Sequence, residues 1–249
     1  MNRAVFNKKG TKRPPNIAGL AKSGLIEQSK IYIPDVMKTV LHKSLYLFTL
    51  LVFIALVFPA RAEEKTILAM GDSLMVGYNL PPGSSFPAQL EDWLRGKGID
   101  VKVLNSGVSG DTSSGGLSRL EWALASVPGG APDLLILEFG ANDMLRGIDP
   151  AVTRKNLDAI LKNLSDKGIP VLVMGMKAPP NMGPEYEQEF NVIFPELAKK
   201  YGAGLYPFYL EGIAAIPDLN LGDGIHPNER GVAVMVSRAG PMIMELIKD

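Results

Sequence analysis

The chain has no cysteine in its 249 residues, and histidine occurs only twice, at His42 and His226. The lack of cysteine excludes disulfides, thiolate metal ligands and a cysteine nucleophile. Two distant histidines cannot build a multi-histidine zinc site of the usual kind, so we expect no metal site. If the protein forms a covalent intermediate, its nucleophile must be a serine, a threonine, a lysine or a carboxylate.

The chain also lacks net charge, because 26 basic residues balance 26 acidic ones. The balance is uneven: residues 1–62 hold ten Lys/Arg and two Asp/Glu, which leaves 16 basic against 24 acidic residues in the body. The body carries no stripe of Lys or Arg, and an acidic surface repels phosphate backbones. Nucleic acid is therefore not an expected partner.

One long hydrophobic run is present, Leu45–Phe58, which is apolar except for Thr49. Basic residues precede it and the small-x-small sequence Ala60-Arg61-Ala62 follows it, which is the pattern of a secretory signal peptide. A membrane anchor is the alternative, but 14 residues rise only about 21 Å as a helix, short of the roughly 30 Å hydrocarbon core. We expect cleavage near Ala62, a periplasmic or secreted product and no stable membrane span after processing.

These features divide the chain into three parts. Residues 1–36 precede Met37, which would itself begin a normal signal peptide, and they show no sustained periodicity, so we expect a non-native or disordered extension. Residues 37–62 are the predicted signal peptide. Residues 63–249 show no internal repeat or linker and are expected to form one catalytic domain, monomeric in solution.

Apolar runs alternate with amphipathic stretches through the body, which predicts β-α-β units around a mostly parallel sheet, an α/β fold. The expected strands are Thr66–Met70, Val101–Leu104, Leu134–Phe139, Val171–Met176 and Gly204–Tyr206. The expected helices are Phe86–Arg95, Gly116–Ala125, Val152–Lys167, Glu185–Lys200 and a last one from Asn228 towards Ile247, which Pro241 should kink or split. Ligands bind beyond the carboxyl ends of such strands, so the loops there should hold the chemistry.

The loop after the first expected strand contains Gly71-Asp72-Ser73-Leu74. It places a hydroxyl where the chain leaves the sheet, although a helix cap or a turn would account for the same residues. The loop after the second strand contains Ser109-Gly110-Asp111-Thr112, whose small residues let backbone N–H groups face a ligand. A flexible turn before a capped helix is the alternative.

The loop after the third strand, Gly140-Ala141-Asn142-Asp143, offers a side-chain amide that could bind an anion or cap a turn. Near the C-terminus, Asp223 stands three residues before His226, the only imidazole in the body. This spacing lets the carboxylate hold Nδ1–H and leaves Nε2 free to accept the Ser73 proton. Pro227 suits the first position of a helix. Together the loops predict a serine hydrolase.

The four blocks resemble those of the SGNH hydrolases, or GDSL esterases, in order and across the whole body. Further stretches, Leu145-Arg146-Gly147, Ala178-Pro179-Pro180-Asn181 and Asp223 to Asn228, are similar to the bacterial thioesterase I, lysophospholipase and arylesterase subgroup. This resemblance implies a three-layer flavodoxin-like sandwich with five parallel strands in the order 2-1-3-4-5. It also implies a Ser73, His226 and Asp223 triad, an oxyanion hole formed by the Ser73 and Gly110 N–H groups with the Asn142 amide, and no cofactor.

The expected substrates are small acyl or aryl esters, thioesters or lysophospholipids. Apolar side chains in loops near the expected site suit such groups, although each could equally serve in core packing: Met144, Leu145, Pro179, Pro180 and Met182. Within the same family, a carbohydrate acetylesterase acting on envelope glycans would use the same four blocks. A non-catalytic binding module on the same sheet is an alternative of another class.

Overall fold

The computed structural model describes residues 32, 34–57 and 64–248. The chain divides into two compact units, Met1–Arg61 and Ala62–Asp249. The described part of the first unit is mainly helix α1 (Asp35–Val57), which includes most of the apolar run. Most of the expected extension 1–36 and the expected cleavage position at Ala62 lie outside the described residues. Of the helices in the described ranges, none has both the length and the hydropathy that a membrane crossing requires.

The second unit is built on a five-stranded parallel sheet with the strand order β2-β1-β3-β4-β5. Its strands are β1 (Lys65–Gly71), β2 (Val101–Gly107), β3 (Leu134–Glu138), β4 (Val171–Met174) and β5 (Gly204–Tyr206). The expected three-layer α/β fold and its strand order are confirmed. Strand β2 runs three residues beyond Leu104, because Asn105 to Gly107 continue the pairing with Ala69 to Gly71.

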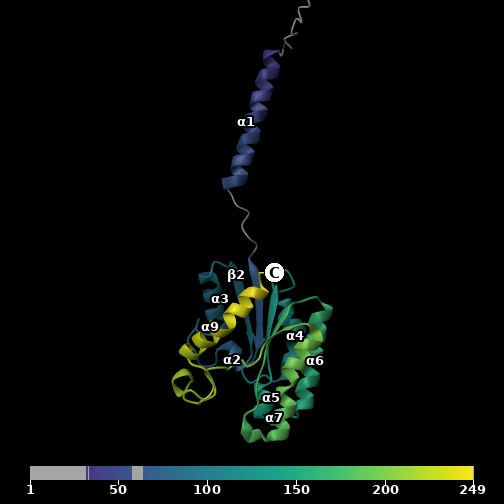
Figure 1. The fold of residues 1–249 in the computed structure, drawn as a ribbon, viewed down its shortest axis with the longest axis vertical. Helices are drawn as coiled ribbons and strands as arrows, with labels where there is room; N and C mark the ends of the chain where they lie inside the picture. The colour runs from purple at the N-terminus through teal and green to yellow at the C-terminus, as the bar shows by residue number, and fades with distance from the viewer. Residues whose placement is uncertain (1–31, 33, 58–63, 249) are drawn as a thin grey trace, which may run out of the picture. The chain divides into compact units, whose positions relative to one another are not determined.

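Helices cover both faces of this sheet (Figure 1). Helix α3 (Phe86–Gly96) packs against α9 (Glu229–Leu246) on one face. Helices α4 (Ser113–Ala125), α6 (Pro150–Asp166) and α8 (Ile193–Tyr201) pack in sequence on the other. In α3 the buried residues Phe86, Leu90 and Leu94 recur every four positions, which places them on one stripe facing the core.

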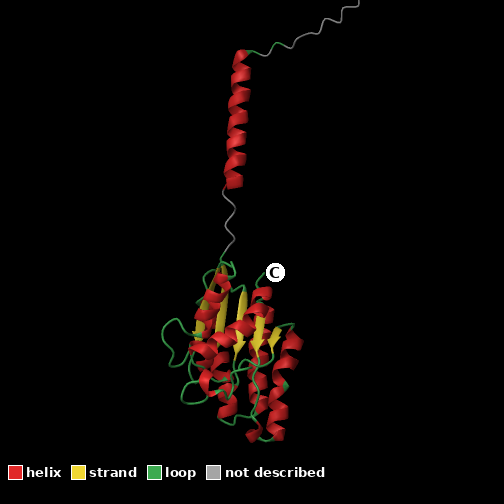
Figure 2. Ribbon diagram, turned by 60° about the vertical axis from the view of Figure 1, so that its left-hand side comes forward, coloured by secondary structure: helices red, strands yellow, loops and turns green. Residues whose placement is uncertain are grey.

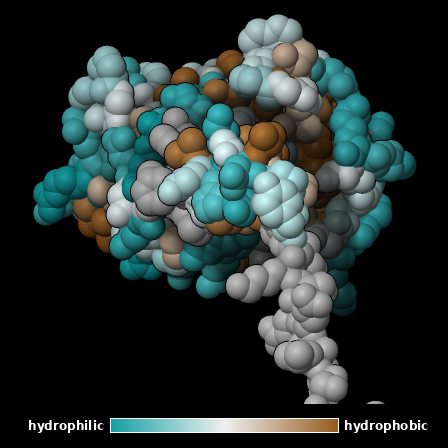
Figure 3. Space-filling model, turned by 90° about the horizontal axis from the view of Figure 1, so that it is seen from above, coloured by the Kyte–Doolittle hydropathy of each residue, from teal (hydrophilic) through white to brown (hydrophobic). Residues whose placement is uncertain are grey.

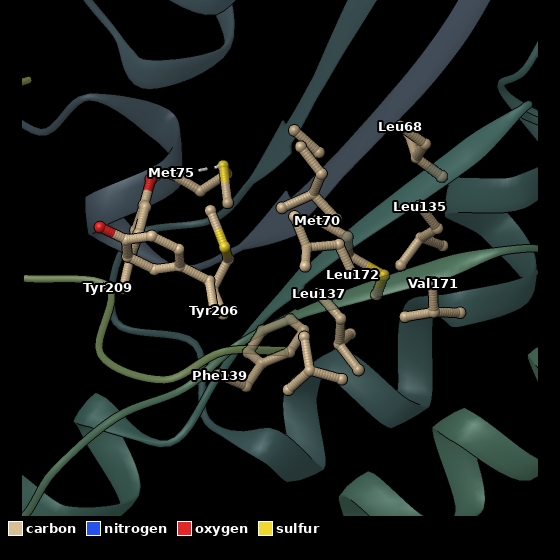
Figure 4. Packing of buried hydrophobic residues seen from close by; sticks show 14 of the residues in the cluster. Leu68, Met70, Met75, Leu135, Leu137, Phe139, Val171, Leu172, Tyr206 and Tyr209 are labelled. Carbon is tan, nitrogen blue, oxygen red and sulfur yellow. Dashed lines mark hydrogen bonds between the residues drawn. The ribbon is translucent and has the colours of Figure 1, made fainter. Parts of the chain in front are cut away.

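The central strands are buried along their whole apolar length, because helices cover both sides of the sheet. Residues 67–70 of β1 and 134–137 of β3 are at most 1% exposed. Figure 4 shows part of this core: Leu68, Met70, Leu135 and Leu137 lie in one cluster with Met75, Phe139 and Tyr209. The Tyr209 hydroxyl lies 3.9 Å from the Met75 sulfur. Each such buried side chain contributes about 1.5–3 kcal/mol relative to exposure. Continuous hydrophobic runs, without alternation, are what a doubly covered parallel sheet requires.

One helix prediction needs correction, and of the two effects expected at Pro241, a kink or a split, the split does not occur. The expected helix Glu185–Lys200 is two helices, α7 (Pro184–Asn191) and α8, separated at Val192. Pro195 explains the break, because its ring would clash with the carbonyl of Asn191 in a continuous helix. Conversely, Pro241 does not split α9, which continues to Leu246.

The helix α9 holds together around Pro241 because its apolar face is buried on both sides of the proline. Val236 and Ile243 are at most 3% exposed, and a Cβ on Gly240 would lie 2.9 Å from the Trp93 ring. This close packing against α3 compensates for the hydrogen bond that the proline cannot donate. Helix α9 also begins later than expected: Asn228 is its cap and Pro227 lies outside it, paired with Asn220.

Short elements connect the carboxyl ends of the strands to the covering helices. They are α2 (Ser73–Val76), α5 (Ala141–Leu145) and the 3₁₀ turns η1 (Pro180–Met182) and η2 (Pro217–Leu219). In Figure 2 the strand arrows all point to the end of the sheet where these loops gather. Figure 3 is seen from above Figure 1, from the end of the sheet opposite to these loops, and this face is largely hydrophilic with apolar residues interspersed among polar ones. The loop end is therefore where the predicted residues must be sought.

Candidate active site

Ser73 is the first residue of α2 and is separated from the end of β1 only by Asp72. Asp72 caps this helix, and its Oδ1 accepts the N–H of Leu74 at 2.9 Å. Because the chain passes from strand to helix within one residue, the side chain of Ser73 stands at the edge of the sheet. The structure thus gives the Gly-Asp-Ser block both roles considered from the sequence: Asp72 is the cap and Ser73 remains available.

His226 lies in a tight loop before α9. The loop is closed by the N–H of Leu221, which donates to the His226 carbonyl at 2.7 Å, and by the bridge between Asn220 and Pro227. Gly224 has a φ of 69°, a left-handed conformation that favours glycine at this turn. The loop therefore holds the imidazole at a defined position above the sheet edge.

The three residues predicted for the triad lie in contact. His226 Nε2 is 3.0 Å from Ser73 Oγ, and His226 Nδ1 is 2.8 Å from Asp223 Oδ2. The ring of Tyr78 lies against the imidazole, with 4.5 Å between ring centres. A serine hydroxyl, an imidazole and a carboxylate are connected in the order that proton transfer requires.

Asp223 is held as a carboxylate by the same turn. Its oxygens accept the backbone N–H groups of His226 at 3.0 Å and Ile225 at 2.9 Å, in addition to the imidazole. These hydrogen bonds, the one from the His226 backbone foremost, lower the pKa of Asp223 to about 2. Its side chain is 37% exposed and that of His226 19%. The anion is therefore maintained by directed donors more than by burial.

The three predicted oxyanion donors differ in their present partners. Among the described residues, no acceptor is found for the backbone N–H groups of Ser73 and Gly110, which are free to bind a ligand. The Asn142 amide, in contrast, donates to Asp72 Oδ2 at 2.8 Å and to the Asp111 carbonyl at 3.0 Å. Asn142 can bind an oxyanion only if it exchanges one of these acceptors.

A partly buried arginine connects the loops that follow β1 and β2. Arg119 Nε lies 2.6 Å from Asp111 Oδ2, while its two terminal nitrogens donate to the carbonyls of Ser106 and Gly71, both at 2.9 Å. Sequence reasoning missed this residue, because nothing in its local pattern marks it. Through Asp111 and Gly71 it fixes the backbone on either side of the Ser73 and Gly110 donors.

A cavity of about 400 Å³ opens beside Ser73 and His226. Of the predicted substrate-binding residues, Met144, Leu145 and Pro179 line it, whereas Pro180 and Met182 belong to η1 and do not. Gly110 and Asp223 also lie outside the lining. The remaining lining is mainly apolar and includes side chains that sequence reasoning did not identify: Met176, Ala178, Phe208, Leu210 and Ile225.

A second buried carboxyl group lies directly beneath Asp72. Glu138, the last residue of β3, is fully buried, and its Oε2 accepts the Asp72 N–H at 3.1 Å. Sequence reasoning overlooked Glu138 because it treated the run Leu-Leu-Ile-Leu-Glu-Phe as an apolar strand. A glutamate inside such a run is itself a signal of a buried polar contact, since glutamate is almost never fully buried without a partner. In the described ranges, no three His, Cys, Asp or Glu side chains are grouped to hold a metal ion.

Known proteins are similar to this chain in sequence and in fold. The family model of GDSL-like lipases and acylhydrolases matches residues 69–234. An arylesterase of Vibrio mimicus is 40% identical over 181 residues, 73% of this chain and 88% of that protein. The thioesterase 1/protease 1/lysophospholipase L1 of Escherichia coli K12 is 37% identical over 178 residues, 72% of this chain and 82% of its own.

A solved structure agrees with these relatives. The crystal structure of AlinE4, an esterase of the SGNH-hydrolase family, is 48% identical and superposes with a TM-score of 0.64, covering 75% of this chain and 98% of that one. The family match spans the strand ends and loops that hold Ser73, Asn142 and His226. This chain belongs to the GDSL-like lipase/acylhydrolase family, the SGNH hydrolases.

Proposed function

We propose that the protein is a serine ester hydrolase in which Ser73 is the nucleophile, His226 the general base and Asp223 the residue that orients the base. The observation that carries this proposal is the 3.0 Å contact between Ser73 Oγ and His226 Nε2, with Nδ1 of the same ring 2.8 Å from Asp223. A serine hydroxyl is inert until a base takes its proton, and this contact supplies the base.

The reaction proceeds in two halves. His226 accepts the Ser73 proton as Oγ attacks the substrate carbonyl, and the resulting imidazolium then gives that proton to the leaving alcohol or thiol. Water attacks the acyl-enzyme with His226 again as the base, which releases the carboxylic acid and restores Ser73. No metal ion or organic cofactor takes part in either half.

The tetrahedral oxyanion is held by the backbone N–H groups of Ser73 and Gly110 and by the Asn142 amide. The two backbone donors lack a protein acceptor in the described structure, which suits them to this role. Asn142 joins them by exchanging the Asp111 carbonyl for the oxyanion, while its bond to Asp72 keeps the amide in place. Fixed donors of this kind act where negative charge develops.

The apolar cavity indicates an acyl or aryl substrate: a carboxylic ester, a thioester or a lysophospholipid. Met144, Leu145 and Phe208 present hydrophobic surface beside Ser73, and hydrophobic walls favour acyl chains over hydroxylated sugars. The names of the relatives, arylesterase and thioesterase 1/lysophospholipase L1, agree with this class. A carbohydrate acetylesterase would need polar groups to bind the hydroxyls of its glycan.

The proposal extends to where the enzyme acts. Residues 37–62 serve as a signal peptide that is removed near Ala62, and residues 63–249 function as a monomer in the periplasm or outside the cell. The basic residues before the apolar run and the Ala-Arg-Ala sequence after it support this. Mass spectrometry of the exported protein would locate the new N-terminus.

Covalent labelling tests the nucleophile directly. A fluorophosphonate probe should modify the wild-type protein once, at Ser73, and Ser73→Ala should lose both the label and the hydrolysis of p-nitrophenyl acetate. Ser237→Ala is the matched control, because that exposed hydroxyl bonds only the Val234 carbonyl of its own helix. Full hydrolysis by Ser73→Ala would refute the proposal. Comparison of p-nitrophenyl octanoate, lysophospholipid and acetylated xylan would then establish the substrate class.

A further inference from the structure

Two carboxyl groups are buried side by side under the proposed nucleophile. Asp72 and Glu138 are both 0% exposed, and their side chains lie within hydrogen-bonding reach of each other. Glu138 Oε2 also accepts the backbone N–H of Asp72 at 3.1 Å. The approach is so close that a Cβ on Gly71 would lie 2.5 Å from Glu138 Oε2. Glycine at 71 therefore makes room for this carboxyl group.

The surroundings decide which member carries the charge. Asp72 accepts two strong hydrogen bonds, from the Leu74 N–H at 2.9 Å and from the Asn142 amide at 2.8 Å. Glu138 accepts only the Asp72 N–H, and among the described residues its Oε1 has no partner. A fully buried carboxylate oxygen without a donor is costly, whereas a protonated carboxyl can donate to its ionised neighbour.

Burial and the charge of the neighbouring Asp72 favour the same assignment for Glu138. Burial raises the pKa of Glu138 well above 4.5, and the adjacent Asp72 raises it further. Tyr209, also fully buried nearby, is likewise kept in its neutral form by burial. The nearby cation Arg119 directs its hydrogen bonds to Asp111, Ser106 and Gly71 and not to the side chains of the pair. One proton shared by two carboxyl groups leaves a single negative charge, on Asp72, which accepts the hydrogen bonds of Leu74 and Asn142.

We propose that Glu138, neutral and protonated, is a positioning residue that holds Asp72 by both its backbone and its carboxylate, and so fixes the turn that carries Ser73. This inference rests on the proposed role of Ser73. Asp72 in turn holds the Asn142 amide, so one buried proton organises both the nucleophile and an oxyanion donor. A second negative charge here would repel the oxyanion, which the neutral Glu138 avoids.

Two substitutions separate positioning from simple space-filling. Glu138→Gln keeps a donor and an acceptor in the same volume, so this variant should retain most of the kcat for p-nitrophenyl acetate. Glu138→Leu keeps the volume but removes both, and a small displacement of the Ser73 turn should lower kcat by about 10²-fold with little change in KM. Ile136→Val, a fully buried change on the same strand, controls for altered packing of β3.

If Glu138 only filled space, Glu138→Leu would keep full activity, since replacing a buried polar group by an apolar one of similar volume is often neutral or stabilising. That result, or equal losses in the Gln and Leu variants, would overturn the proposal. Circular dichroism and thermal unfolding would confirm that each variant is folded.

A spectroscopic measurement covers the case in which the Leu variant does not fold. The infrared difference spectrum between wild type and Glu138→Gln at pH 8 should show the carbonyl band of one protonated carboxylic acid, lost in the variant. Only carboxylate bands in that difference would overturn the assignment, whatever the activities. This readout does not depend on Ser73, so a failure of the proposed function, seen as full activity in Ser73→Ala, is distinguishable from a failure of this inference.

Discussion

Asp223 holds His226 at two points at once: one carboxylate oxygen accepts the backbone N–H at 3.0 Å, and the other lies 2.8 Å from Nδ1 of the ring. Orientation of the imidazole is thus achieved within one turn of four residues, without a third element of the fold. This local arrangement explains how a carboxylate that is 37% exposed can still fix the tautomer of the proposed base.

Asp223→Asn should impair catalysis far more than binding. The amide can still contact the ring, but it no longer favours the tautomer with a proton on Nδ1 or stabilises the imidazolium, so kcat should fall by up to about 10⁴-fold. Steady-state kinetics with p-nitrophenyl acetate would measure this. Asp218→Asn, which removes an exposed carboxylate from the same loop region, should have little effect. Equal kinetics of Asp223→Asn and wild type would exclude the orienting role.

Asn142→Ala should lower kcat by about 10² to 10³-fold with a smaller change in KM, the size expected for loss of one oxyanion donor. The substitution also frees Asp72 Oδ2 and the Asp111 carbonyl, which accept the amide now. Kinetics and thermal unfolding of the same variant would separate the two effects. A loss of stability with unchanged kcat would show that Asn142 only supports the loops.

Phe208→Ala tests whether the apolar cavity binds the acyl group. Phe208 lines the cavity, and removing its ring should lower kcat/KM for p-nitrophenyl octanoate by about 10-fold or more relative to p-nitrophenyl acetate. The ratio of the two esters is the informative quantity, because it cancels any general loss of active enzyme. An unchanged ratio would place the acyl chain elsewhere.

Glu138 should make the protein less stable as pH rises. Its pKa in the folded state lies well above 4.5, so above that pH the unfolded chain releases a proton that the folded chain retains. Stability therefore falls with pH until the folded pKa is reached. Urea unfolding at pH 5 and pH 8 should show a smaller decrease in Glu138→Gln than in wild type; parallel decreases would mean that Glu138 is ionised in the folded protein.

Local patterns in the sequence were sufficient to find the strands and the four loops. Each apolar run that was interpreted as a strand is a strand. The central strands β1, β3 and β4 give the clearest signal, because burial on both faces makes them nearly continuous apolar runs. The pattern was insufficient where two local rules competed. Pro195 ends a helix that the spacing of apolar residues would continue, whereas Pro241 lies inside one because α3 packs against it.

The sequence by itself determined which chemical groups are available: a chain with no cysteine and one histidine in its body has few ways to build a covalent catalyst. It also determined that Asp223 can reach His226, since only two residues of a turn, Gly224 and Ile225, lie between them. Only the tertiary structure decided that His226 meets Ser73 across 153 positions, that Asn142 is already engaged, and that Glu138 lies against Asp72. Those contacts depend on parallel strands ending at one edge, a relationship that exists only after distant segments pair.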